Sequence, residues 1–391
     1  MKKNLKEIQN AIKKEGFSGW LFYDFHKRNP ICYSILGIPS DLMFTRRWFY
    51  FVPAEGEPIK IVHPVEKNKL DSLKGEKIVY FGWKNLQEVL KKVIPKKGKI
   101  AMDYSPNCNV PYISYVDAGT MEFLKSIGIK VLSSQNLIQN FEAKISKEGY
   151  KLHKVAQKKV DKILKETFNF IKENLGKIKE YEAQKFILKR FEEENLTCEG
   201  DPPIVGVQEH PADPHFAPTK ENSFLIEKDQ TLLIDLWAKV KSEEGIYYDI
   251  TWCAYTGKNP PKKYLEIFDV VLKARDSAID FIKSRFKKGK KVYGYEVDDV
   301  SRGVVEKAGY GKYFVHRTGH SIGKNVHGNG VNIDNLETKD ERVLEKGLLF
   351  SIEPGIYLEG EMAVRTEVDV FINYDGKVEI TGEVQEELIY L

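Results

Sequence analysis

The feature that most constrains this chain is a pair of acidic residues, each placed inside an otherwise apolar run. Asp235 interrupts residues 231–238, and Asp249 interrupts the next apolar run, residues 245–255. Both runs have the composition of strands, and the polar residues 241–245 between them predict a hairpin turn. Antiparallel pairing would bring the two carboxylates side by side, where burial is costly unless they bind a donor or a cation. The alternative is that either aspartate lies at a strand end and is solvated.

Glutamates repeat this pattern nearer the C-terminal end. Glu353 follows an apolar run, and Glu367 lies within residues 362–372. Alternation with a period of two places Arg365, Glu367 and Asp369 on one face of a strand and valines on the other. The pattern predicts a polar sheet face near Glu353. The alternative is a solvent-facing side of an antiparallel sheet, which gives the same alternation.

Histidines complete the set of candidate ligands. His316, His320 and His327 fall in one short segment, which lacks the HExxH spacing of a zinc-binding helix. A loop or a strand is therefore expected there. His215 lies between prolines that hold the chain extended, although a single histidine is also common as a structural residue. Four carboxylates and one imidazole suit two divalent cations of the manganese, iron or cobalt type, rather than a thiolate zinc site.

Composition excludes several other classes of protein. The 391 residues favour two domains, and 42% hydrophobic with 30% charged residues is typical of a soluble globular protein. The 61 Lys and Arg nearly balance the 57 Asp and Glu, so no nucleic-acid partner is indicated. The cysteines are scattered without a CxxC pair, which favours the reducing cytoplasm. No signal peptide is evident, and no stretch approaches the roughly 20 apolar residues of a membrane-spanning helix.

The pattern of elements changes near residue 142. Residues 1–142 alternate helical and extended patterns, which predicts a small α/β domain. Long amphipathic helices are then predicted at 146–175 and 178–195. From residue 204 onward β-runs dominate, interrupted by predicted helices at 261–285 and 296–308. The boundary between two domains is therefore placed between residues 142 and 146.

The order of the acidic residues and histidines is more specific than any one of them. Asp in one strand, Asp in the next, and then GHxIG, EPG and RxE resemble the metal-binding pattern of the M24 or pita-bread metallopeptidases. This family includes methionine aminopeptidase, aminopeptidase P, prolidase and the metal-free creatinase. The resemblance is strong over residues 204–370, and the N-terminal half matches only in its general α/β character. It implies a creatinase/prolidase-type α/β domain at 1–142 and an α+β pita-bread catalytic domain at 146–391.

The resemblance also implies roles for individual residues. The expected metal ligands are Asp235, Asp249, His320, Glu353 and Glu367. Among them, Asp249 and Glu367 would bridge both ions, and Glu353 would also move the proton. His215 and His327 would face the substrate, whereas His316 is not expected to bind metal. Two divalent ions are expected, with Mn²⁺ favoured over Co²⁺, Fe²⁺ or Zn²⁺. The interval between the two aspartates is longer than in the family pattern, and the extra length fits the predicted turn.

The implied activity is hydrolysis of the bond between an N-terminal residue and a following proline. A dipeptidase must also bind the free carboxylate beyond that bond, for which arginine is suited. Between His327 and Glu353 the sequence offers Arg342, which does not resemble such a clamp, and Lys339 as a substitute. An Xaa-Pro aminopeptidase is therefore favoured, with an Xaa-Pro dipeptidase (prolidase) as the alternative and a non-catalytic binding protein as a further one. The resemblance also implies a homodimer.

Overall fold

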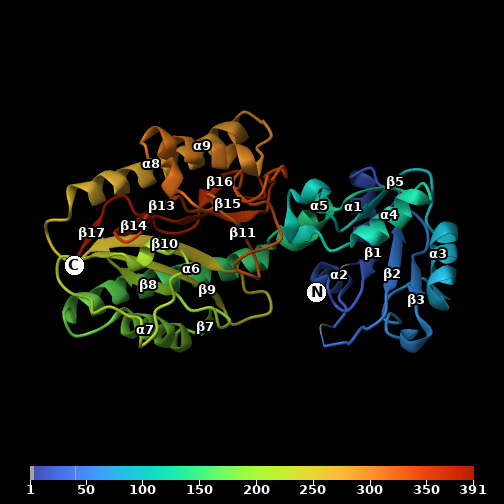
Figure 1. The fold of residues 1–391 in the computed structure, drawn as a ribbon, viewed down its shortest axis with the longest axis horizontal. Helices are drawn as coiled ribbons and strands as arrows, with labels where there is room; N and C mark the ends of the chain where they lie inside the picture. Colours follow the sequence, from blue (N-terminus) through green and yellow to red (C-terminus); the bar gives the residue numbers. More distant parts are fainter. Residues whose placement is uncertain (1–3, 40) are drawn as a thin grey trace. The chain divides into compact units, whose positions relative to one another are not determined.

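The structure is a computed structural model that describes residues 4–39 and 41–391. Within this part of the chain the fold divides into two compact units, one ending at Glu142 and the other beginning at Ala143. Figure 1 shows the course of the chain through both units. Each unit has its own hydrophobic core, which is the physical signature of separate domains.

The N-terminal unit is built on one mixed sheet. Its strands are β1 (Gly19–Asp24), β2 (Trp48–Pro53), β3 (Ile59–Val62), β4 (Glu76–Val79), β5 (Lys99–Met102) and β6 (Lys130–Ser133). They lie in the order β4-β3-β2-β1-β5-β6. β2 runs antiparallel to β1 and β3, whereas β1, β5 and β6 are parallel and β3 is parallel to β4. All of these strands except β2 therefore point the same way.

Helices cover both faces of this sheet. They are α1 (Leu5–Lys14), α2 (Pro30–Leu36), α3 (Gly82–Val93), α4 (Ala118–Ser126) and α5 (Gln135–Ile138). Trp20 and Phe22 pack in the core that contains α1 and α2, whereas Leu21 and Tyr23 pack in the core that contains α3 and α4. Successive strand residues face opposite sides, so β1 is apolar throughout because both of its faces are buried.

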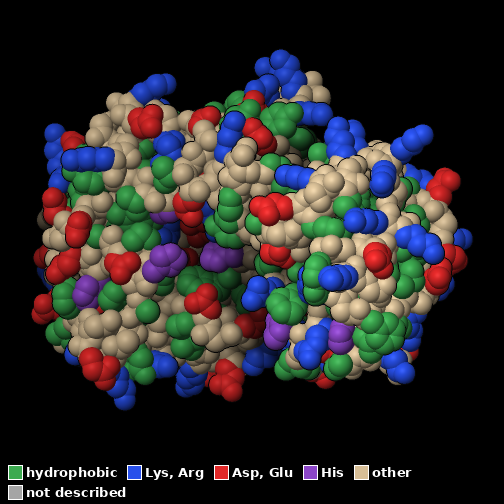
Figure 2. All heavy atoms as spheres, turned by 45° about the vertical axis from the view of Figure 1, so that its right-hand side comes forward, with side chains coloured by type: hydrophobic (Ala, Val, Ile, Leu, Met, Phe, Trp, Pro, Cys, Tyr) green, Lys and Arg blue, Asp and Glu red, His purple; other side chains and the backbone are tan. Residues whose placement is uncertain are grey.

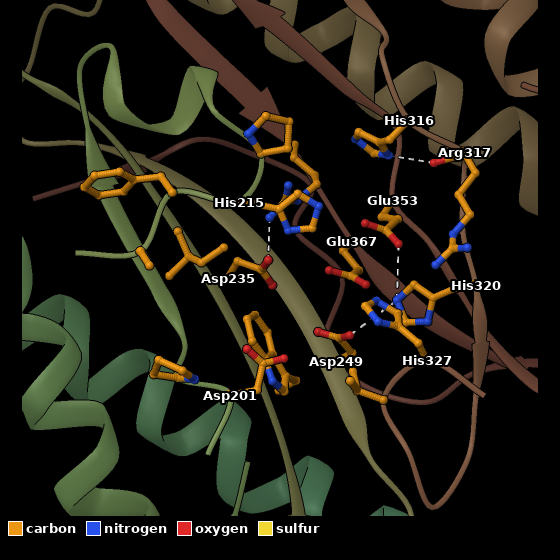
Figure 3. Close-up of a pocket in the computed structure, with 18 of the residues that line it drawn as sticks. Asp201, His215, Asp235, Asp249, His316, Arg317, His320, His327, Glu353 and Glu367 are labelled. Carbon is orange, nitrogen blue, oxygen red and sulfur yellow. Dashed lines mark hydrogen bonds and ion pairs between the residues drawn. The ribbon is translucent and has the colours of Figure 1, made fainter. Parts of the chain in front are cut away.

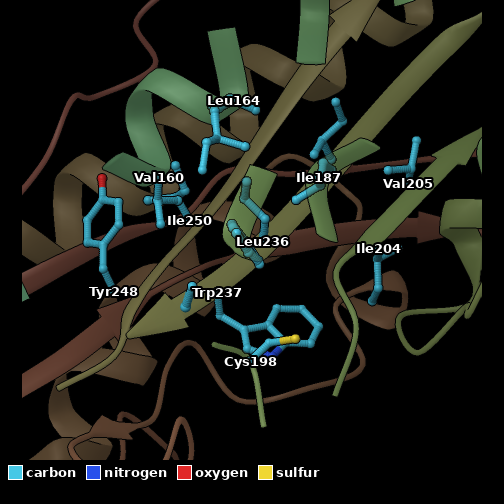
Figure 4. Close-up of a cluster of buried hydrophobic side chains, with 14 of the residues drawn as sticks. Val160, Leu164, Ile187, Cys198, Ile204, Val205, Leu236, Trp237, Tyr248 and Ile250 are labelled. Atoms are coloured by element: carbon cyan, nitrogen blue, oxygen red, sulfur yellow. The ribbon is translucent and has the colours of Figure 1, made fainter. Parts of the chain in front are cut away.

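The second unit begins with two long helices, α6 (Lys147–Glu173) and α7 (Glu180–Glu193). Ser146 caps α6, because its Oγ accepts a hydrogen bond from the backbone N–H of Gly149 at 3.0 Å. Val160 and Leu164, one turn apart on α6, pack with Ile187 of α7 against the sheet (Figure 4). This contact fixes the helices on one side of the strands that carry the site.

The strands of the second unit form several small sheets. One contains β7 (Leu196–Thr197), β8 (Ile204–Val207), β9 (Thr231–Val240), β10 (Tyr248–Tyr255) and β17 (Ile389–Tyr390). Another contains β11 (Ser321–Ile322), β12 (Leu349–Ile352), β15 (Val368–Ile372) and β16 (Val378–Ile380). A hairpin of β13 (Gly355–Leu358) and β14 (Met362–Arg365) completes them.

A second pair of helices covers the other side of these strands. They are α8 (Lys262–Lys287) and α9 (Gly294–Lys307), which pack against each other, and α8 also contacts β14. Figure 1 shows α6 and α7 on one side of the strands and α8 and α9 on the other. The second unit is thus a layer of strands between two helix pairs, and the strands can present polar side chains to a shared interior.

Most elements lie close to their predicted positions. The helices predicted at 146–175 and 178–195 are α6 and α7, and those predicted at 261–285 and 296–308 are α8 and α9. The sequence did not predict α2. Its apolar residues are buried on several sides, so it lacks the amphipathic pattern on which the prediction of helices depended. The described residues contain no helix long and apolar enough to span a membrane.

Candidate metal centre

Separate strands and strand ends bring the five expected ligands together. Asp235 lies within β9, Asp249 within β10, His320 just before β11, Glu353 just after β12, and Glu367 between β14 and β15. Figure 3 shows these side chains directed into one cavity of the second unit. Figure 2 shows a hollow in which histidine and acidic side chains gather.

The register between β9 and β10 sets the spacing of the two aspartates. The strands pair antiparallel as predicted, but Asp235 lies opposite Thr251 and Asp249 lies opposite Trp237. The two carboxylates therefore lie on one face of the strand pair, but not directly opposite each other. The aspartates are diagonal neighbours on one face, a relation that separates residues by about 7–8 Å. Diagonal placement leaves room for a charged group between the carboxylates.

His320 contacts two of the acidic residues. Its Nε2 atom is 3.6 Å from Oδ2 of Asp249 and 3.3 Å from Oε1 of Glu353. One ligand atom from each of Asp249, His320 and Glu367 lies within 4.8 Å of the others. All three residues are buried, so this is a compact group of potential ligands shielded from water.

Several carboxylate oxygens in this cluster have no hydrogen-bond partner among the described residues. They are Oδ1 of Asp235, Oδ1 of Asp249, Oε1 of Glu367 and Oδ1 of Asp369. A buried oxygen without a donor is destabilising unless something else compensates its charge. Divalent cations with oxygen and imidazole ligands would supply that compensation, so the residues present fit a metal site.

Arg365 and its neighbours hold the rest of the cluster. The guanidinium of Arg365 forms an ion pair with Asp235 and donates from Nε to Oγ1 of Thr251 at 3.1 Å. Thr251 in turn donates to Oε2 of Glu367 at 2.8 Å. On its other side Arg365 donates to the hydroxyl of Tyr357 at 2.9 Å. One cation therefore fixes two acidic residues through direct and relayed hydrogen bonds.

Burial and mutual repulsion raise the pKa values of these carboxyl groups. Burial raises the pKa of Asp249 well above its usual range, and the negative charges of Asp235 and Asp369 add to the effect. Burial raises the pKa of Glu353 to about 7, against the opposing positive charges of Arg365 and Arg317. Burial also lowers the pKa of His320, which keeps its imidazole neutral. A neutral imidazole is the form that binds metal.

The cavity in front of the cluster has a volume of about 240 Å³. His215 and His327 line it and are exposed to solvent, and the rings of His320 and His327 are 4.3 Å apart. His316 also lines the cavity, but its Nε2 lies 2.6 Å from the hydroxyl of Tyr357. His316 therefore contacts the residues that hold Arg365, in keeping with the expectation that it does not bind metal.

Comparison with known proteins identifies the family. The sequence pattern of Metallopeptidase family M24 matches residues 151–374, which is more than half of the chain. The chain belongs to this family. The resemblance inferred from the order of acidic residues and histidines is thus confirmed, and so is the assignment to the metallopeptidases.

Individual M24 relatives support the same placement. An Xaa-Pro dipeptidase from Lactobacillus helveticus is 35% identical over 173 residues, which span 44% of this chain and 42% of the relative. The match thus covers less than half of that relative. A prolidase from Thermococcus sibiricus is 25% identical with a TM-score of 0.64, covering 99% of this chain and 98% of its own. A dipeptidase from Mycobacterium ulcerans has a TM-score of 0.71 at 21% identity, and the match covers 99% of this chain and 96% of the dipeptidase. Both solved structures confirm the expected fold class, an α/β unit followed by an α+β pita-bread unit.

The two basic residues considered as carboxylate clamps lie elsewhere. Arg342 is buried, with 1% of its side chain exposed, and forms an ion pair with Asp340 at 2.6 Å. It also donates to the backbone oxygen of Asn329 at 2.7 Å, so it ties loops together. Lys339 is exposed and pairs with Glu341 at 2.9 Å. Neither residue lines the cavity of this M24 chain.

Other residues at the site were not assigned from the sequence. Thr251 shares a strand face with Asp249, and Arg317 lies inside the histidine segment and lines the cavity. Strand parity and closeness to an expected ligand could have identified both. Asp201 also lines the cavity, with its side chain exposed. Tyr357 reaches Arg365 from a different strand, and no local pattern marks it.

Proposed function

We propose that this chain is a dinuclear-metal Xaa-Pro dipeptidase. The observation that carries the proposal is the buried cluster of expected ligands, whose unpartnered oxygens face a small cavity that also contains Arg317. The names of the M24 relatives support the class of substrate, a peptide with proline at its second position. An Xaa-Pro aminopeptidase acting on longer peptides is the second candidate.

Each member of the cluster has a role in this proposal. Asp235, Asp249, His320, Glu353 and Glu367 would together hold two divalent cations, Mn²⁺ by preference. Divalent cations bound there would make water a better nucleophile near neutral pH and would polarise the scissile carbonyl. Arg365 would hold Asp235 in place, because it is the buried ion-pair partner of that carboxylate.

Proton transfer would depend on Glu353. Its carboxyl lies at the cavity wall, within reach of a bound substrate, where a carboxylate can accept and release a proton. It would accept a proton from the attacking water and deliver it to the departing proline nitrogen. His215 and His327, on the solvent side of the cavity, would donate hydrogen bonds to the substrate as charge develops on its oxygen.

The charges of the cavity wall favour a dipeptide. In Figure 3, Arg317 and Asp201 lie on opposite sides of the carboxylate cluster. A guanidinium suits the free carboxylate of a dipeptide, and a carboxylate on the other side suits its ammonium group. The sequence favoured longer peptides because Arg342 does not resemble a clamp, but that argument did not consider Arg317. The small volume of the cavity also suits a short substrate.

The decisive experiment compares a dipeptide with substrates that lack its free carboxylate at that position. We expect kcat/KM for Ala-Pro to exceed that for Ala-Pro-amide and for Ala-Pro-Ala. Arg317→Gln should lower kcat/KM for Ala-Pro by about tenfold to a hundredfold, because a charge-assisted hydrogen bond is lost, and should leave the amide nearly unchanged. Lys339→Gln is the matched control, since it removes an exposed positive charge outside the cavity. Equal or faster hydrolysis of Ala-Pro-Ala would establish the aminopeptidase instead.

The remaining properties of the proposal follow from the family resemblance. A homodimer is proposed, and light scattering at micromolar concentration would test it. Cytoplasmic localisation is in keeping with cysteines that form no disulfide among the described residues. Metal analysis after reconstitution should give about two ions per chain, with Mn²⁺ restoring the most activity.

A further inference from the structure

The N-terminal unit contains a cavity that the proposed peptidase activity does not use. Its volume is about 730 Å³, and every residue that lines it belongs to the unit that ends at Glu142. It lies where β1, β3 and β4 end and β2 begins, and it is lined by residues next to those ends, including Tyr23, His63 and Tyr80. Ligands of open α/β sheets characteristically bind outside the carboxyl ends of the parallel strands.

Arginines dominate the charge of this cavity. Arg28, Arg46 and Arg47 all line it, and no ion pair joins any of them to a carboxylate in residues 4–39 and 41–391. The guanidinium of Arg46 donates to the backbone oxygen and the hydroxyl of Thr45, and that of Arg28 lies 5.5 Å from the ring centre of Phe25. Because these three cations line one cavity, they repel one another.

The acidic residue that shares the cavity is already engaged. Asp117 accepts a hydrogen bond from the hydroxyl of Tyr23 at 2.7 Å and from the backbone N–H and hydroxyl of Thr120 at 2.9 and 2.8 Å. It thereby caps α4 and forms no ion pair with an arginine among the described residues. When the negative charge of Asp117 is counted, the net charge of the cavity lining remains positive.

Aromatic side chains supply the apolar part of the wall. Trp83, Phe25 and Phe123 line the cavity together with the tyrosines, and Trp83 leaves 60% of its surface exposed. Phe81, two residues before Trp83, is 72% exposed. Large exposed aromatic surface beside unpaired guanidinium groups is suited to planar anions, because rings stack while arginines bind the charge.

Helix geometry reinforces the positive potential. α3 begins at Gly82 and α4 at Ala118, and both Gly82 and Gly119 line the cavity. The N-terminus of α3 has no side-chain cap and therefore offers backbone N–H groups and the positive end of its dipole to the cavity, whereas Asp117 already caps α4. A side chain at Gly82 would meet no atom within 4 Å, so the approach to this helix end is open.

We propose that this cavity binds a small organic anion, with its carboxylate or phosphate group held by Arg28, Arg46 and Arg47. The planar or apolar body of the ligand lies against Trp83 and Phe123. The site is separate from the metal cluster, which lies in the other unit. It therefore stands independently of the proposed peptidase activity.

Calorimetry on the full chain tests this with phenyl phosphate and benzoate as probes, which separate the phosphate and carboxylate forms of the ligand. Phenol and inorganic phosphate are the comparison compounds, since phenol lacks the anionic group and inorganic phosphate lacks the aromatic ring. We expect saturable binding of at least one organic anion, tighter than either comparison compound. Arg47→Gln and Arg28→Gln should each weaken it by about tenfold or more, through loss of a charge-assisted contact. Trp83→Ala should weaken the binding of the organic anion more than the binding of inorganic phosphate.

Two control variants keep the result interpretable. Lys125→Gln removes an exposed positive charge from the same unit outside the cavity and should leave binding unchanged. Asp249→Asn disables the candidate metal centre, a possible alternative anion site, and should also leave binding unchanged. Retained cooperative melting would show that the arginine variants fold. Equal affinity in wild type and Arg47→Gln, loss of binding in Asp249→Asn, or no saturable binding of either organic anion would overturn the proposal.

Discussion

Buried carboxylates occur in both units, but their surroundings differ. In the N-terminal unit, Asp103 accepts hydrogen bonds from Trp20 Nε1 at 3.0 Å, Asn29 Nδ2 at 2.8 Å and Ser134 Oγ at 2.6 Å. In the catalytic unit, Asp249 is equally buried, yet its Oδ1 has no hydrogen-bond partner among the described residues. The same kind of group is satisfied by protein donors in one unit and left incomplete in the other.

This difference separates a structural carboxylate from a functional one. Burial raises the pKa of Asp103, but its hydrogen-bond donors oppose this effect, so this carboxylate needs no external cation. The cluster around Asp249 concentrates several carboxylates with too few donors, and burial, reinforced by mutual repulsion, raises their pKa values. An external cation would complete such an arrangement, so missing partners, rather than burial alone, distinguish this site from Asp103.

The largest expected effect is that of Asp249→Asn on activity. Removing this ligand should lower kcat/KM for Ala-Pro by about a thousandfold or more, because metal ions contribute several kcal/mol to such reactions. Metal content should fall with it, as measured by elemental analysis of the purified variant. Asp103→Asn is the matched control and should keep both metal and kcat. Wild-type turnover with full metal content in Asp249→Asn would refute the assignment of this ligand.

A smaller effect is expected at the solvent side of the cavity. His327→Gln should lower kcat by about a hundredfold, because this is the usual effect of losing one donor that stabilises a developing oxyanion. Metal content should stay unchanged. Steady-state kinetics and metal analysis on one preparation would check this. If metal content also fell in this variant, His327 would have to be counted among the metal ligands.

Removal of metal should affect the two units unequally. Ions that bind only the folded catalytic unit stabilise it by about 3–4 kcal/mol when they are present at 100 to 1,000 times their dissociation constant. Chelation should therefore increase amide hydrogen exchange in β9, β10 and β15 and leave β1 and β5 unchanged. Equal loss of protection in both units would show that their stabilities are coupled and that the comparison does not hold.

The smallest and most specific effect concerns stability without metal. In chelator, Asp103→Asn should lower the free energy of unfolding by about 1–3 kcal/mol, because buried hydrogen-bond donors lose a charged acceptor. Asp249→Asn should have the opposite sign and raise the melting temperature, because it removes one of several repelling buried carboxylates. Thermal melts of both variants in chelator show whether each substitution lowers or raises the stability. Destabilisation by Asp249→Asn under these conditions would mean that protein donors already satisfy Asp249.

Much of the architecture was accessible from the sequence. The helices α6 and α7 follow from a proline-free segment with helical periodicity and a serine cap, which are local properties. The short helix α2 was missed because tertiary burial, rather than an amphipathic stripe, stabilises it. The order of acidic residues and histidines predicted which side chains meet, since the family pattern already encodes that order.

The sequence by itself determined the candidate ligands, and the tertiary structure decided how they meet. Apolar runs interrupted by Asp235 and Asp249 are visible in the sequence because burying a charge is unusual in any fold. The diagonal register of these aspartates depends on how the whole hairpin pairs, and no local pattern specifies it. The ion pair of Arg365 with Asp235 and the position of Arg317 in the cavity bring together residues far apart in the chain. Such contacts depend on packing between strands, and only the folded chain shows which charges remain without a partner.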